Sequence, residues 1–168
     1  MPNWIRTYVR HVDALNYRIG RFAMYLLFAL MGVMLWASFA RVALTPAIWT
    51  DEMGQFLLLG YFMLGGAYSL QLGSAVRMDL FYNRWSDRTK AFVDVVTILA
   101  LIFYLVVLLY GAVESTAYAI EYAERRRGLW RPYMWPIKGV MCIGIVMMIL
   151  QCISIFFKDF AKLRGEEL

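Results

Sequence analysis

The stretch from Val95 to Val113 reads VVTILALIFYLVVLLYGAV, and none of its 19 residues is Asp, Glu, Lys or Arg. As an α-helix it would be about 28 Å long, close to the roughly 30 Å thickness of the hydrocarbon core of a bilayer. Three further runs have no charged residue, and they are Phe22–Ala40, Met53–Val76 and Gly139–Phe157. Four such runs predict four membrane-spanning helices.

The composition of the whole chain agrees with this prediction. The 168 residues are 62% hydrophobic and 17% charged, whereas a soluble domain is about half apolar and a quarter charged. All 17 Lys and Arg and all 12 Asp and Glu lie outside the four runs. A chain of this length with four spans has no room for a separate soluble domain. This excludes a soluble enzyme, a nucleic-acid-binding module and a secreted disulfide scaffold.

We therefore expect one all-α membrane domain over residues 1–168, with spans at about 21–42, 51–74, 91–114 and 136–157. Thr50 or Asp51 is expected to cap the second helix. The helical pattern of the third helix continues to Glu124, so this helix is expected to project beyond the membrane.

Residues 76–90, between the second and third spans, have a different character. Met78, Phe81 and Trp85 recur at helical spacing, while Arg84 and Arg88 lie on another face. A helix with one apolar and one basic face lies in the plane of the membrane interface. The sequence therefore predicts an amphipathic interfacial helix here, with its arginines at the lipid headgroups.

The positions of the basic residues predict the orientation in the membrane. The N-terminus, the segment between the second and third spans and the C-terminus together carry 11 Lys and Arg, against six on the opposite side. Basic residues favour the cytoplasmic side, so both termini are predicted to be cytoplasmic. We therefore attribute the net charge of +5 to basic residues that set the membrane topology and contact anionic lipid, and not to binding of nucleic acid.

The spans contain no ionisable group of the kind that marks a transport pathway. The nearest polar residues are Glu114, at the edge of the third span, and Gln71 in the second. His11 is the only histidine, so no pair of haem ligands exists, and Cys142 and Cys152 do not form a CxxC motif. We expect no catalytic, metal or cofactor site, and a chain that by itself neither catalyses nor transports.

Small residues recur every fourth position in two of the expected helices, and these are Gly65, Ser69 and Gly73, then Gly111, Ser115 and Ala119. Small side chains at this spacing let helices in a membrane approach closely. Two interpretations stay open at this point. The stripes pack either within this bundle or against another subunit.

Three short motifs resemble the small membrane subunit of TRAP (tripartite ATP-independent periplasmic) transporters, the DctQ family. Trp49-Thr50-Asp51-Glu52 is similar to the family's Trp-x-x-Glu, and Pro132–Lys138 is similar to its Pro-x-x-Trp-Pro entry to the last helix. Gly73 with Val76–Leu80 is similar to its Gly-x-His-x-Arg-x-Asp segment. The family's usual histidine is Ala75 here, so any role of that histidine does not carry over.

The resemblance implies a small, non-catalytic subunit of a sodium-coupled importer of organic acids in the bacterial inner membrane. Its implied partners are a large membrane subunit, whose immobile scaffold it packs on and stabilises, a periplasmic substrate-binding protein that it helps to dock, and membrane lipids. The substrate and sodium sites are implied to lie in the large subunit. No cofactor and no nucleic acid is implied for this chain.

The candidate residues for contacts with partners or lipid are Trp49, Asp51, Glu52, Arg77, Asp79, Arg84, Arg88, Arg125, Arg126, Arg127, Arg131 and Trp135. The four arginines from Arg125 to Arg131 lie on the side that the positive-inside rule disfavours. Two interpretations of these arginines stay open. In the first they bind lipid headgroups and pair locally with Glu121 and Glu124, with Glu121 and Arg125 as an i,i+4 pair. In the second they help to dock an acidic face of the binding protein. Two other functional classes stay open, a small homo-oligomeric transporter or channel and a membrane anchor subunit of a redox complex.

Overall fold

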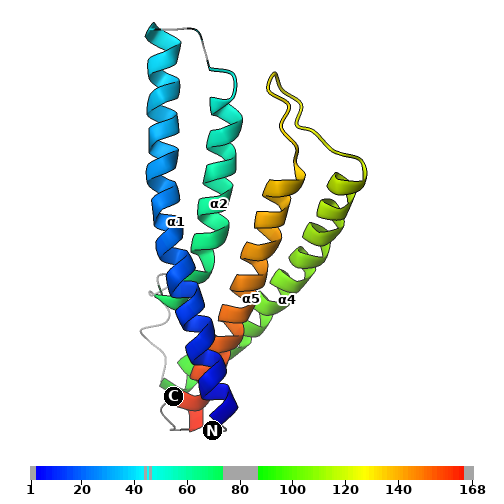
Figure 1. The fold of residues 1–168 in the computed structure, drawn as a ribbon. Helices are drawn as coiled ribbons and strands as arrows, with labels where there is room; N and C mark the ends of the chain where they lie inside the picture. The colour runs from blue at the N-terminus through cyan, green and yellow to red at the C-terminus, as the bar shows by residue number, and fades with distance from the viewer. Residues whose placement is uncertain (1–2, 44, 46, 74–86, 165–168) are drawn as a thin grey trace.

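The computed structural model describes residues 3–43, 45, 47–73 and 87–164, and the side chains at 4–43, 45, 47–73 and 93–161. These residues form four helices, α1 (Asn3–Ala43), α2 (Thr50–Gln71), α4 (Asp87–Glu121) and α5 (Trp135–Arg164) (Figure 1). Each contains a stretch that is long and apolar enough to cross a membrane. The expected all-α membrane protein with four spanning helices is confirmed.

Three of the described helices are longer than a bilayer requires, and the shortest of the three is α5 with 30 residues, about 45 Å. α1 has 41 residues, about 61 Å, because it includes the basic N-terminal segment that precedes the expected span. α4 has 35 residues, about 52 Å, in line with the expected projection. The membrane boundaries of all four spans stay predictions.

The predicted interfacial helix over residues 76–90 lies mostly outside the described residues. Arg77, Asp79 and Arg84 belong to that part, and their placement stays a prediction. Residues 87–90 form the first turn of α4, so Arg88 lies on this helix.

The predicted cap of α2 is wrong. The helix begins at Thr50, and Trp49 occupies the cap position without a side-chain hydrogen bond to the helix. Because the helix starts at Thr50 itself, this hydroxyl donates backwards to the carbonyl of Ala47 at 2.7 Å. Asp51 instead pairs with Arg41 at the end of α1.

The four helices pack in the spatial order α1, α2, α5, α4. α5 contacts the other three helices, whereas α4 packs mainly on α5, and α1 packs on α2 and α5 (Figure 1). The most deeply buried larger side chains outside α1 are accordingly on α5, and they are Ile145, Gln151, Cys152 and Ser154. α5 is therefore the central element of a thin layer of helices.

One continuous face of α1 packs against α2 and α5. Its buried residues are separated by three or four positions, or by two seven-residue repeats between Ala23 and Ala37, and they are Ile5, Val9, Val12, Asn16, Gly20, Ala23, Ala37 and Ala40. This spacing keeps one face of a helix towards its neighbours over many turns. The opposite face carries large exposed apolar side chains such as Phe22, Tyr25 and Phe28.

α2 and α5 cross at a glycine. A Cβ atom added at Gly144 would lie 2.8 Å from the carbonyl oxygen of Met63 and 2.7 Å from its Cβ. A real side chain there would push the two backbones apart. The absence of a side chain at this position therefore permits the α1–α2 pair to approach the α4–α5 pair closely.

A polar cluster joins the N-terminal part of α1 to the end of α5. Asp13 accepts hydrogen bonds from Gln151 Nε2 at 3.1 Å, Ser154 Oγ at 3.2 Å and Lys158 Nζ at 2.5 Å. Asn16 donates to Gln151 Oε1 at 2.5 Å. Because the side chains at 16, 151 and 154 are at most 1% exposed, these groups depend on one another for hydrogen bonds.

Replacing Gly144 by alanine should lower the free energy of unfolding of the purified subunit by about 1–3 kcal/mol, because the added methyl group overpacks the crossing with Met63. Gly139→Ala is the matched control on the same helix, since nothing lies within 4 Å of its added Cβ. Thermal unfolding in detergent measures both. Equal stability of the two variants would contradict the close crossing.

Replacing Asp13 by alanine should destabilise the subunit by about 2–3 kcal/mol, because it leaves Lys158 without its ion pair and Gln151 and Ser154 without an acceptor. Asp51→Ala removes an ion pair whose side chains are 59% and 64% exposed, and should cost less than about 1 kcal/mol. The comparison uses the same unfolding measurement. A larger loss at Asp51 than at Asp13 would contradict the role of the buried cluster.

Candidate interaction surfaces

The chain between α4 and α5 folds back on itself over residues 122–134, a segment that we call the arginine hairpin. Its two arms face each other at an isolated antiparallel bridge between Arg125 and Tyr133. Two backbone hydrogen bonds of 3.0 Å close it, from Arg126 N–H to the Pro132 carbonyl and from Met134 N–H to the Glu124 carbonyl.

Two residues in this hairpin have left-handed backbone conformations, Ala123 (φ 45°) and Arg131 (φ 50°). Residues other than glycine adopt this backbone conformation at a cost in conformational free energy. Ala123 comes two residues after Glu121, the last residue of α4, and Glu124 N–H donates to the Ala119 carbonyl at 3.0 Å. The left-handed conformations at these two positions turn the chain sharply back towards α5, in spite of their cost in free energy.

Two of the four arginines form contacts within the subunit. The guanidinium of Arg125 lies 4.4 Å from the centre of the Tyr133 ring and donates to its hydroxyl. Arg126 reaches across to α2 and donates to Oε1 of Gln55. These two arginines therefore hold the hairpin in place.

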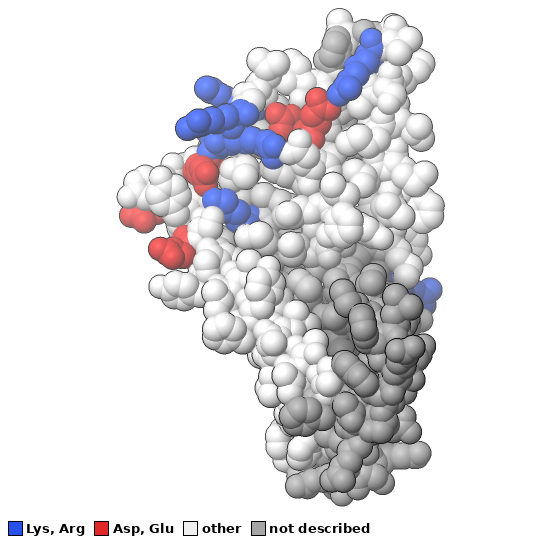
Figure 2. Space-filling view, turned by 180° about the vertical axis from the view of Figure 1, so that it is seen from behind, with Lys and Arg blue, Asp and Glu red and all other residues white. Residues whose placement is uncertain are grey.

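The other two arginines face outward. Arg127 and Arg131 are exposed, and neither side chain has a hydrogen-bond or ion-pair partner in the part of the chain that the structure describes. Between them, Leu129 is 84% exposed and Trp130 is 43% exposed. Figure 2 shows basic side chains gathered at the hairpin end of the molecule, beside acidic ones. The tip thus combines free positive charge with exposed apolar surface.

The expected pairing of these arginines with Glu121 and Glu124 is wrong. α4 ends at Glu121, so Arg125 is no longer one helical turn away and contacts Tyr133 instead. Glu124 forms its ion pair with Lys138 at 2.6 Å. The same ammonium donates to the Ser115 carbonyl at 3.3 Å.

The candidate residues at the start of α2 lie at the same end of the molecule as the hairpin. Trp49 is 38% exposed, and Asp51 forms an exposed ion pair with Arg41 at 2.6 Å. Glu52, by contrast, is buried with 9% exposure. A Cβ atom at Gly128 would collide with its Oε1, so the hairpin lies directly on this carboxylate.

Trp135 begins α5 and is 50% exposed. It lines an open cavity of about 320 Å³ together with Ile120, Ala123 and Tyr133. Its aromatic ring at this end of α5 fits the aromatic belt of a membrane interface.

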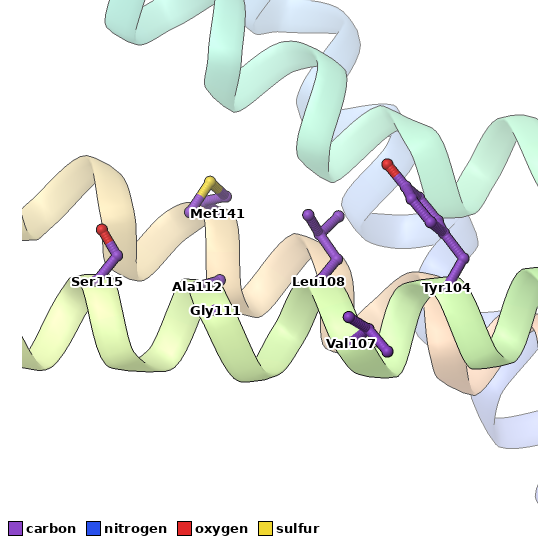
Figure 3. A pocket seen from close by; sticks show the side chains of 7 residues that line it. All are labelled: Tyr104, Val107, Leu108, Gly111, Ala112, Ser115 and Met141. Carbon is purple, nitrogen blue, oxygen red and sulfur yellow. The ribbon is translucent and has the colours of Figure 1, made fainter.

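A second surface is an open groove of about 350 Å³ on α4, lined by Tyr104, Val107, Leu108, Gly111, Ala112, Ser115 and Met141. In Figure 3, Leu108 of α4 and Met141 of α5 point to the same side, and Gly111 leaves a gap along the helix. The lining is almost wholly apolar. It has the shape that another helix or a lipid chain fills in a membrane.

The two stripes of small residues pack only in part within the subunit. Gly73 lies beyond Gln71, the last residue of α2, and has a left-handed backbone (φ 64°), so the predicted stripe in this helix ends before it. Ala119 is fully buried, but no atom of the described residues lies within 4 Å of a Cβ added at Gly65 or Gly111. These glycines therefore leave space for lipid or for another subunit.

Sequence reasoning missed the residues that hold the hairpin on α2, Gln55 and Gly128, and the exposed partner of Asp51, Arg41. It also missed the Asp13 cluster. Gln151 and Ser154 are three positions apart inside an apolar run, a spacing that signals a shared polar face. No comparable signal connects Gly128 with α2.

Within the described residues, no group of three or more His, Cys, Asp or Glu side chains could hold a metal ion. Comparison with characterised proteins and with solved structures gives no match.

The family model of the DctQ component of tripartite ATP-independent periplasmic transporters matches residues 19–162. This match covers α2 and α4, α1 apart from its first 16 residues and α5 apart from its last two, and it includes both surfaces described above. The chain therefore belongs to the DctQ family, the small membrane subunit of TRAP transporters.

Proposed function

We propose that this chain is the non-catalytic small subunit of a sodium-coupled TRAP importer of organic acids in the bacterial inner membrane. It packs on the scaffold of the large membrane subunit and helps to dock the periplasmic binding protein. Family membership supports the role as one component of a tripartite transporter. The uncharged spans support a role in which substrate and sodium bind elsewhere.

The observation that carries the packing role is the thinness of the bundle. Within the most apolar windows of α1 and α4, only 11% of residues are buried, and even in the central α5 the share is 33%. Lipid alone can cover exposed apolar surface, because lipid chains are as apolar as leucine. The groove at Gly111 is more specific, since small residues with open space let a second helix approach closely.

The docking role is supported by the tip of the arginine hairpin. With Arg127 and Arg131 unpaired beside Leu129 and Trp130, the tip offers charge for carboxylates and apolar area for a partner. Contacts of this kind at an interface rim act mainly on the association rate and weaken with salt.

Replacing Gly111 by leucine should reduce the amount of large subunit that co-purifies with this chain by about tenfold, which corresponds to about 1.4 kcal/mol. The added side chain fills the groove, while the isolated subunit keeps its stability because the groove is open and nothing lies within 4 Å of a Cβ atom added at that position. Gly32→Leu is the control, since it adds the same side chain at an equally open position of α1. An intact complex with the Gly111 variant would exclude this groove as the contact.

Reversing the charge of both Arg127 and Arg131 to glutamate should raise the binding-protein concentration that gives half-maximal uptake by about tenfold at low ionic strength. The difference should shrink when choline chloride is added at constant sodium, because added salt screens rim charges. Arg10→Glu with Arg18→Glu makes the same charge change on an exposed part of α1. If the parent protein, the hairpin double variant and the α1 double variant all need the same binding-protein concentration for half-maximal uptake, the hairpin does not dock the binding protein.

A further inference from the structure

Glu52 is the one acidic residue at the start of α2 that the structure buries. Its side chain is 9% exposed, and its Oε2 is closed to solvent without any hydrogen-bond partner among the described residues. Its Oε1 lies against Gly128, where there is no room for a Cβ atom. The carboxylate is thus enclosed between the first turn of α2 and the backbone of the arginine hairpin.

A buried carboxylate oxygen without a donor is unfavourable unless nearby positive charge compensates for it. The hairpin brings positive charge to the same part of α2. Arg126 contacts Gln55, which lies one helical turn after Glu52 and therefore beside it on α2. Arg125 and Arg127 flank Arg126 in sequence. In turn, the negative charge beneath the hairpin reduces the repulsion among its arginines.

The hairpin also needs an external support. Only two backbone hydrogen bonds close it, and two of its residues have left-handed conformations. A short isolated hairpin is marginally stable at best. Its contacts with α2 are the hydrogen bond from Arg126 to Gln55 and the contact of Gly128 with Glu52, and both lie in the first two turns of α2.

We propose that Glu52 is a positioning residue, which seats the arginine hairpin on α2 through Gly128 and so directs Arg127 and Arg131 outward. The seat spans the two helix pairs, because α2 belongs to one pair and the hairpin connects α4 with α5. A side chain at position 128 would overlap Oε1 of Glu52, so the carboxylate would have to shift from its place against the hairpin. The link to docking rests on the proposed function, whereas the seat itself does not.

The seat is tested in the assembled transporter by the distance between spin labels at Leu129, which is 84% exposed, and Ile48, which is 53% exposed. Cys142 and Cys152 are first replaced by alanine so that only the two sites are labelled. We expect one narrow distance in the parent protein and a broad distribution in both Gly128→Ala and Glu52→Ala. Gly139→Ala, which meets no neighbour, should keep the narrow distance.

The double variant Glu52→Ala with Gly128→Ala isolates the contact. Removing the carboxylate makes room for the methyl group, so the double variant should be no broader than Glu52→Ala alone. If the two substitutions broaden the distance distribution independently, so that the double variant shows the sum of both effects, direct contact between Glu52 and Gly128 is overturned. Narrow, parent-like distances in both single variants would overturn the seat altogether.

Uptake separates the seat from the docking function. Glu52→Ala should raise the binding-protein concentration for half-maximal uptake by about fivefold, with a much smaller effect on the maximal rate, because the hairpin acts on association. Glu52→Gln keeps the shape and removes the charge, so a partial defect would show that both contribute. If the spin-label distances broaden while the dependence on binding protein stays that of the parent, the seat stands and the docking function falls.

Discussion

A lipid bilayer offers no hydrogen-bond partners to the peptide backbone, so every N–H and C=O inside it must be satisfied within the chain. This constraint makes each of the four uncharged runs a helix. It also places the irregular arginine hairpin, with its two left-handed residues, at an end of the molecule, outside the uncharged runs. The helices and the connection between α4 and α5 follow from the same solvent requirement.

Within this constraint the hydrophobic effect does little to hold the helices together, because lipid is as apolar as the side chains. The bundle uses close approach and polar contacts instead. Gly144 allows α5 to cross α2 at van der Waals distance, and Asp13 collects donors from three residues of α5. α5 is central because it takes part in both. The outer faces of α1 and α4 remain apolar and exposed, as suits surfaces that face lipid or another component of a tripartite transporter.

The four arginines of the hairpin divide into two structural classes, although they look equivalent in the sequence. Arg125 and Arg126 are committed to Tyr133 and Gln55, and a substitution at either one would disturb the hairpin itself. Among the residues that the structure describes, Arg127 and Arg131 have no such partner, so their positive charge is available to a partner or to lipid. Glu52 of α2 lies against Gly128, and through this contact we infer that it positions the hairpin that carries both pairs of arginines.

The sequence by itself determined the fold class and the four spanning helices that the described residues form, because the length of an uncharged run and the thickness of a bilayer decide them locally. The short motifs at Trp49–Glu52 and Pro132–Lys138 were likewise sufficient to indicate the DctQ family, which the family model confirmed. Only the tertiary structure decided that Glu52 is buried while Asp51 beside it is exposed, that Glu124 pairs with Lys138 and not with an arginine, and that Asp13 meets Lys158. Each of these depends on contacts between segments distant in the chain or on where a helix ends, and helical periodicity carries no information about which distant residue a side chain will meet.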